Sequence, residues 1–157
     1  MTSTLQVGGP GWIDRHLQAY LATDGAEGHM LDFSPGGGRT ETPTLILKTI
    51  GRRTGNPHLT PLIYGRHGRE IVVIGSKGGA PEHPAWFLNL KAAPEVAFQV
   101  ADKKYRGPWR VPEGAERAEV WNHMVELYPP YSDYQARAAG REIPVVLLDP
   151  REETDAL

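Results

Sequence analysis

The feature that most constrains the fold is a series of short β-rich runs in the middle of the chain, separated only by turn-forming residues. Residues 44–49 and 59–64 flank a turn-like segment, 51–57, and a fully apolar run, 71–74, follows a second turn at 66–69. Strands joined by so few residues pair antiparallel, because a parallel connection needs a crossover of a dozen residues or more. The sequence therefore predicts an antiparallel meander.

Helical periodicity flanks this meander. Apolar side chains recur every three or four residues in 11–23, in 84–93 and in 112–128, and the last segment ends at Pro129-Pro130. Further strands are predicted at 96–100, 105–111 and 143–148. About six antiparallel strands with helices across the ends favour a mainly β, α+β domain whose sheet is a closed or partly closed barrel.

We expect three parts along the chain. Residues 1–42 hold the first helix and a flexible, glycine-rich, lid-like segment at 26–42; residues 43–150 form the barrel; residues 151–157 are a polar tail. Loops as long as 26–42 are often functional.

The first helix has two interpretations. Ile13, Leu17, Tyr20 and Leu21 fall on one face, which would cover the core. Alternatively, the helix makes peripheral contact with a membrane surface, with Trp12 as its anchor. No segment reaches the ~18 uncharged apolar residues of a membrane span, and Met1–Pro10 lacks the pattern of a signal peptide, so we expect a cytoplasmic protein.

Composition argues against several classes of function. The 17 basic and 19 acidic residues give a net charge of −2, which does not favour nucleic-acid binding. The absence of cysteine removes disulfides, thiolate nucleophiles and iron–sulfur clusters. The six histidines lack metal-ligand spacing, and neither a P-loop nor a Gly-x-Gly-x-x-Gly fingerprint is present. We expect no metal site, and a small-molecule substrate as the partner.

Two cationic, glycine-rich turns remain as candidate binding loops. The first presents Arg52, Arg53 and Thr54, and Arg forks match phosphate or carboxylate oxygens. The second, Ser76–Gly79, combines a hydroxyl, an ammonium and glycine N–H groups that can wrap an anion. Each could equally be a solvated turn. Together they favour a multiply charged ligand.

Aromatic residues form a second candidate binding feature. Tyr128, Tyr131 and Tyr134 recur every three residues around the proline pair. They form either a wall for a planar ligand or a small satellite core. Trp86, in the segment that follows the second loop, is likewise either core or cofactor wall.

Taken in order, these motifs closely resemble the deazaflavin-dependent nitroreductase family. The resemblance covers about residues 43–150, and the first 42 residues match loosely. It rests on the segments 47–55, 61–62, 76–79, 84–90, 128–135 and 141–145.

The resemblance implies a single split β-barrel, similar to FMN-binding barrels, and coenzyme F420 as the hydride carrier. It implies that the cofactor is bound by Arg52, Arg53, Thr54, Gly55, Pro61, Ser76, Lys77, Gly78, Gly79, Pro84, Trp86 and Asn89. The first turn and residues 76–79 would hold its phosphate and acidic tail, and Pro61, Trp86 and Asn89 would lie along the deazaflavin. Tyr128, Tyr131 and Tyr134 would line the substrate pocket.

The expected reaction is hydride transfer to an activated double bond, a quinone or a nitroaromatic. Tyr131 is the expected proton donor, with Ser76 as its competitor. Three alternatives remain: an FMN-binding reductase on the same fold, a non-enzymatic deazaflavin carrier, and a lipid-binding module built on the first helix. FMN has a single phosphate and no polyacidic tail, so two cationic loops exceed what it needs.

Overall fold

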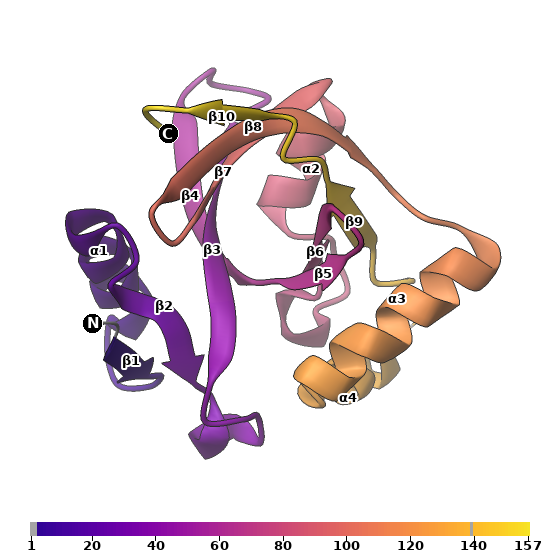
Figure 1. Cartoon of the computed structure of the whole chain (residues 1–157). Helices are drawn as coiled ribbons and strands as arrows, with labels where there is room; N and C mark the ends of the chain where they lie inside the picture. The colour runs from indigo at the N-terminus through magenta and orange to yellow at the C-terminus, as the bar shows by residue number, and fades with distance from the viewer. Residues whose placement is uncertain (1–2, 139) are drawn as a thin grey trace.

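A computed structural model describes residues 3–138 and 140–157 of the chain. In this part of the chain one strongly curled sheet forms the body, and four α-helices pack around it (Figure 1). The path through the sheet is β1-β2-β3-β7-β8-β9-β6-β5, with β4 paired to β3 and β10 paired to β8. Only the β1–β2 pair is parallel among the pairs formed by the described residues.

The strands are β1 (Ser3–Gln6), β2 (Glu27–Asp32), β3 (Thr42–Ile50), β4 (Pro57–Ile63), β5 (Gly65–His67), β6 (Glu70–Ile74), β7 (Glu95–Val100), β8 (Lys103–Arg110), β9 (Val145–Leu148) and β10 (Glu152–Thr154). The helices are α1 (Trp12–Thr23), α2 (Ala85–Lys91), α3 (Gly114–Leu127) and α4 (Pro130–Arg137), with 3-10 turns η1 (Ser34–Gly36) and η2 (Lys77–Gly79). The predicted mainly β, α+β architecture is confirmed, and the described residues form ten strands in place of about six.

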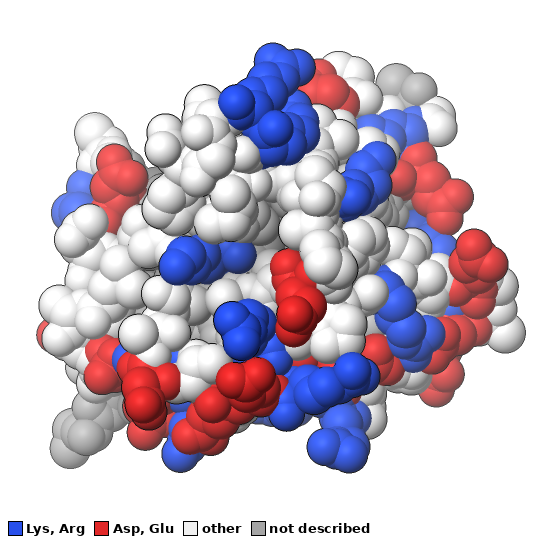
Figure 2. Space-filling view, turned by 90° about the horizontal axis from the view of Figure 1, so that it is seen from above, with Lys and Arg blue, Asp and Glu red and all other residues white. Residues whose placement is uncertain are grey.

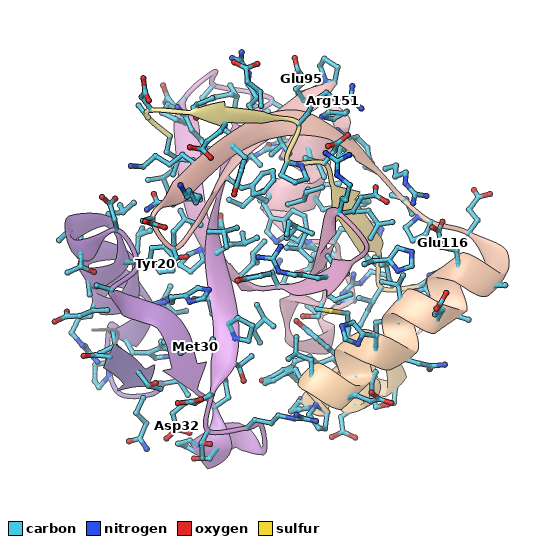
Figure 3. The ribbon with its side chains drawn as sticks, viewed as in Figure 1. Tyr20, Met30, Asp32, Glu95, Glu116 and Arg151 are labelled. Carbon is cyan, nitrogen blue, oxygen red and sulfur yellow. The ribbon has the colours of Figure 1, made fainter. Side chains whose placement is uncertain are left out.

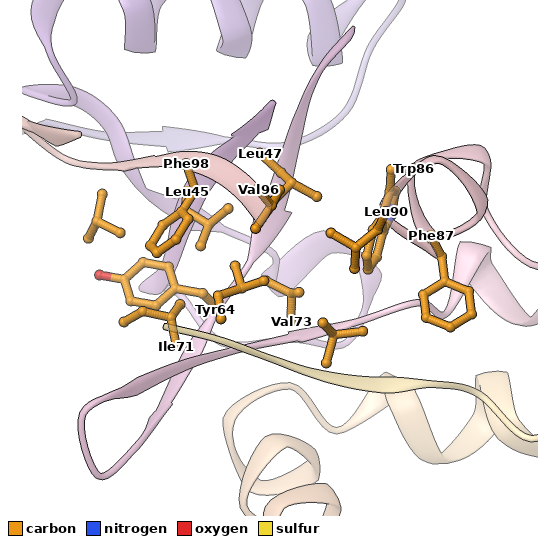
Figure 4. Close-up of a cluster of buried hydrophobic side chains, with 13 residues drawn as sticks. Leu45, Leu47, Tyr64, Ile71, Val73, Trp86, Phe87, Leu90, Val96 and Phe98 are labelled. Carbon is orange, nitrogen blue, oxygen red and sulfur yellow. The ribbon is translucent and has the colours of Figure 1, made fainter. Parts of the chain in front are cut away.

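The core consists of two apolar clusters on opposite faces of β6 and β9. Ile71 and Val73 point into the curl of the sheet, where they meet side chains from β3 and β7 (Figure 4). Val72 and Ile74 point outward, into a cluster with α3 and α4. Side chains alternate between the faces of a strand, so burial of both faces explains why residues 71–74 are apolar without interruption.

Helix α1 is part of this packing. Tyr20 is fully buried between α1 and β3 (Figure 3), and its hydroxyl donates to the Thr44 carbonyl at 2.8 Å and accepts from the Ala101 N–H at 2.7 Å. The predicted covering face was partly wrong, because Ile13 is 53% exposed and His16, one turn before Tyr20, is buried in its place.

The segment 26–42, expected to be a flexible loop, instead contains β2 and η1. Strand β2 pairs antiparallel with β3 through Met30↔Pro43 and Leu31↔Thr42, so it extends the same sheet. Gly28 permits this strand, since its φ is +94° and a Cβ there would lie 2.8 Å from the His16 ring.

The polar tail and the proline pair also differ from expectation. Residues 152–154 form β10, which pairs with β8 through Glu152↔Arg106 and Thr154↔Lys104. Pro129-Pro130 ends α3 as predicted, but Pro130 then begins α4. Proline is well suited to the first position of a helix, because its missing N–H would have no partner there.

Candidate active site

The turn between β3 and β4 is fixed against helix α2 through one side chain. The Arg52 backbone N–H and its Nη1 both donate to Oδ1 of Asn89, at 3.1 and 3.0 Å. Asn89 is buried on α2, and its Nδ2 donates to Thr49 Oγ1 at 3.5 Å. The direction of the Arg52 guanidinium is therefore set by the helix.

Gly55 acts in this turn through its backbone. Its φ is +76°, a conformation that side chains disfavour, and its N–H donates to the Gly51 carbonyl at 2.8 Å. The Thr54 hydroxyl accepts from the Asn56 N–H at 3.2 Å. The turn is thus held by its own hydrogen bonds.

A cavity of about 230 Å³ opens beside this turn. The described residues that line it are Thr49, Gly51, Arg52, Arg53, Thr54, His58, Thr60, Ala85, Trp86 and Asn89, and none of them is acidic. Two guanidinium groups and several hydroxyls without a carboxylate suit a phosphate or carboxylate ligand. The donor set therefore fits the acidic part of F420.

Sequence reasoning missed part of this lining. His58 and Thr60 are two residues apart on β4, so they share one face of the strand. Because Arg53 lies at the end of the same hairpin, this spacing could have identified both as lining residues. Pro61 lies on the opposite face, paired with Ile46, and is outside the lining. Pro84 is buried as the residue that precedes α2.

The second cationic loop connects β6 to α2 and does not line this cavity. Lys77, Gly78 and Gly79 have φ values of +46°, +63° and +84°. A right-handed Ser76 followed by a left-handed Lys77 matches the backbone pattern of anion-binding nests. The Lys77 ammonium lies 2.8 Å from Glu82 Oε1.

The second loop instead packs against helix α4. A Cβ added at Gly79 would lie 2.6 Å from the carbonyl oxygen of Tyr134. The structure therefore brings the Ser76–Gly79 segment next to the tyrosine helix. Arg52 bonds to Asn89 on α2, and Arg53 lines the same cavity as Trp86 and Asn89. Helix α2 and the loop before it connect the two groups of predicted residues.

The three tyrosines meet where α3 ends and α4 begins. The ring of Tyr131 lies edge-on to that of Tyr128, with centroids 4.9 Å apart, and the hydroxyls of Tyr128 and Tyr134 lie 3.0 Å apart. Phe33, just before η1, contacts Tyr128 edge-on at 5.2 Å. Tyr128 and Tyr131 belong to a buried apolar cluster, which matches the satellite-core alternative, and Phe33 from the N-terminal part packs against it.

Burial controls the ionisation of this cluster. Tyr128 and Tyr131 are only 6% and 4% exposed. Loss of solvent raises the pKa of both phenols well above the usual value, and the neighbouring tyrosines raise the pKa further. Both phenols are therefore protonated at pH 7.

The described residues also line other cavities, one of them of about 350 Å³ beside Lys48, Glu95 and Arg106. Seen from above, basic and acidic side chains are mixed (Figure 2), without the single-sign patch of a nucleic-acid binder. Within residues 3–138 and 140–157, no three His, Cys, Asp or Glu side chains are grouped to hold a metal ion. No helix in that part of the chain is long and apolar enough to cross a membrane.

Comparisons with known proteins identify the family of this chain. The model of a family described as F420H(2)-dependent quinone reductase matches residues 12–150. A protein of Mycobacterium tuberculosis (strain ATCC 25618 / H37Rv) named as an F420H(2)-dependent quinone reductase is 34% identical over 152 residues, covering 89% of this chain and 97% of that protein.

Two solved structures are similar to this chain in both sequence and fold. A structure described as an F420-H2 dependent reductase is 37% identical with a TM-score of 0.62, covering 68% of this chain and 94% of that one. Another, described as a domain-swapped dimer, is 30% identical with a TM-score of 0.64 and covers 90% of this chain and all of that one. The split-barrel fold that the resemblance implied is confirmed. The chain therefore belongs to the F420H(2)-dependent quinone reductase family, and coenzyme F420 is its cofactor.

Proposed function

We propose that this protein reduces a quinone with a hydride from reduced coenzyme F420. The observation that carries the proposal is the cavity beside Arg52 and Arg53, whose described lining has two guanidinium groups and no acid. F420 carries a phosphate and an acidic tail, and Arg forks pair with such oxygens bidentately. Membership of the family supports the same assignment.

The cofactor would be held from two sides of helix α2. Arg52, Arg53 and Thr54 would bind its phosphate and acidic tail, and Trp86 would pack along its ring system. The backbone N–H groups of the Ser76–Gly79 loop would contribute a second set of donors. Bound reduced F420 supplies the hydride, so the chain itself needs no covalent step.

The tyrosine cluster would hold the quinone and complete the reaction. Aromatic faces stack on a planar acceptor and keep water away from it. Hydride addition leaves negative charge on a quinone oxygen, and a neutral phenol can donate a proton there. We assign this role to Tyr131, with the Ser76 hydroxyl as the competing donor.

Two measurements test the proposal. In parallel fluorescence titrations F420 should bind more tightly than FMN. Reduced F420 should then be oxidised by a quinone, followed as the decay of its absorbance, and nitroaromatics and activated alkenes can be compared as acceptors. Tighter binding of FMN would favour the FMN-dependent alternative, and F420 binding without turnover of any acceptor would favour a carrier.

We further propose a cytoplasmic protein that contacts a membrane surface through α1. Ile13 is 53% exposed on this helix, and Trp12 lies beside it. The test is cell fractionation with liposome flotation of the wild type and of Ile13→Asp, a change outside the core. Recovery of both proteins free of liposomes would contradict the membrane contact.

A further inference from the structure

Arg141 lies in the segment between α4 and β9, and its guanidinium is surrounded by the loop that follows β6. Nε donates to the Ala80 carbonyl at 2.9 Å and Nη2 to the Ser76 carbonyl at 2.8 Å. Nη1 donates to the Gly75 carbonyl at 3.0 Å and lies 3.0 Å from His83 Nδ1. One side chain thus contacts four residues of the segment 75–83, which includes the Ser76–Gly79 loop that would bind the cofactor.

The geometry requires arginine. A guanidinium presents five N–H groups in one plane, and three carbonyls of a single loop converge on that plane. A lysine has one ammonium on a flexible side chain and cannot donate hydrogen bonds to all three carbonyls in fixed directions. Because Arg141 bonds to main-chain carbonyls, it holds the backbone of the loop, whatever side chains the loop carries.

Arg141 is itself anchored to the tyrosine helix. Its carbonyl accepts from Nε2 of Gln135 at 2.8 Å, and Oε1 of Gln135 accepts from the Ile143 N–H at 2.9 Å. Gln135 lies on α4, directly after Tyr134. The loop and the tyrosines are therefore tied to one support, and Gly79 adds direct contact with the backbone of Tyr134.

We propose that Arg141 is a positioning residue that orders the loop Ser76–Gly79 and sets its distance from the tyrosines of α4. This inference rests on the proposed function in that the ordered loop serves F420. Without Arg141 the loop would sample several conformations, and binding would have to select one of them. Arg141 would act on the cofactor only through the loop, by its bonds to the carbonyls of Gly75, Ser76 and Ala80.

Hydrogen exchange on the cofactor-free protein tests the loop directly. The Gly79 and Ala80 amides donate to the Ser76 and Lys77 carbonyls at 2.9 and 3.1 Å. In Arg141→Ala and Arg141→Lys these amides should exchange at least tenfold faster. The matched control is Arg117→Ala, which removes bonds to Glu142 and the Ile143 carbonyl in the same segment but none to the loop.

Binding supplies the second measurement. F420 should bind Arg141→Ala about ten- to a hundredfold more weakly, the scale expected for misplacement of binding groups. Added guanidinium ion at non-denaturing concentration should restore part of that affinity, but should not affect Arg117→Ala. If Arg141→Ala does not fold, Arg141→Lys provides the same exchange and binding tests.

Two results would overturn the inference. One is unchanged exchange at Gly79 and Ala80 in folded Arg141 variants. The other is an equal effect of Arg117→Ala, which would mean general loosening of the segment. Failure of the wild type to bind F420 would contradict the proposed function alone, because the exchange measurement contains no cofactor.

Discussion

The side-chain oxygen of Asn89 accepts two hydrogen bonds from Arg52, one from the backbone N–H and one from the guanidinium. A single amide on α2 thus fixes both the turn and the direction of its charged group. The guanidinium has further N–H groups that this contact leaves available for an anion. The arrangement orients Arg52 before a ligand arrives, which lowers the ordering cost of binding.

Replacing Asn89 should therefore weaken cofactor binding without removing any charge. Asn89→Ala should raise the Kd for F420 about tenfold or more, because hydrogen bonds to charged groups contribute about 1.5–3 kcal/mol. Asn89→Asp keeps the acceptor but places a carboxylate beside Arg52, so it should also weaken binding. Titrations with circular dichroism as a check on folding would measure both, and wild-type affinity in Asn89→Asp would contradict this role.

The ion pair between Lys77 and Glu82 should reduce the contribution of Lys77 to binding. Both side chains are substantially exposed, at 45% and 63%, so the pair itself adds little stability. Glu82→Gln should strengthen F420 binding about two- to fivefold at low salt, and Lys77→Gln in that background should remove the gain. Because salt screens exposed charges, 0.5 M salt should abolish the difference. A gain that persists at high salt would have another cause.

The two glycines of the second loop should respond differently to alanine. Gly78 and Gly79 both have positive φ, so either change costs about 1–2 kcal/mol of strain. A Cβ at Gly78 meets open space, whereas one at Gly79 would overlap the backbone of Tyr134. Gly79→Ala should therefore lower the free energy of unfolding by about 1–3 kcal/mol more than Gly78→Ala. Denaturant unfolding measures this, and equal losses would show that the loop can move away from α4.

The central strands and helices could be predicted because their patterns follow from burial. Residues 71–74 are apolar throughout since both faces of β6 are covered, and α1, α2 and α3 carry apolar side chains at helical spacing. The candidate residues Arg52, Arg53, Thr54, Trp86 and Asn89 were predicted from the motifs and lie together around one cavity.

The remaining elements lacked such a pattern. Strand β2 has the sequence Glu-Gly-His-Met-Leu-Asp, whose glycine and charges disfavour a strand, and it forms because β3 and β1 supply partners on both sides. Strand β10 is polar because it pairs with β8 at the surface. The bonds from Arg141 to Gly75 and Ser76 span 66 and 65 residues of sequence and have no local signal.

Acid should weaken a surface ion-pair network around Arg110, which bonds to both Glu70 and Glu116. Mainly through Arg110, the pKa of Glu116 is lowered from 4.5 to about 2. The folded pKa is depressed, so this stabilisation is present above pH 4.5 and is lost as the pH falls through about 2. Arg110→Met should lower Tm at pH 7, and the difference from wild type should shrink between pH 4.5 and 2. A difference independent of pH would contradict this.

Tyr131 is the strongest candidate for the proton donor. Burial raises the pKa of its phenol, so ionisation of this group should cause no loss of turnover below pH 10. The hydroxyls of Tyr128 and Tyr134 lie 3.0 Å apart and can bond to each other, so their first role is in holding the wall. The Tyr131 hydroxyl is not part of this hydrogen-bonded pair.

Removing the Tyr131 hydroxyl should slow the chemical step without weakening cofactor binding. Tyr131→Phe should keep the Kd for F420 and lower kcat roughly ten- to a thousandfold, inside or just below the usual range for loss of a general acid. Tyr128→Phe and Tyr134→Phe are the matched controls and should lower kcat less, because Phe retains the aromatic wall. The assay is oxidation of reduced F420 by a quinone under saturating conditions.

If Tyr131→Phe turns over at the wild-type rate while Ser76→Ala does not, the proton comes from Ser76 or from water that it positions. If neither change lowers kcat, the protein orients the two reactants and solvent supplies the proton.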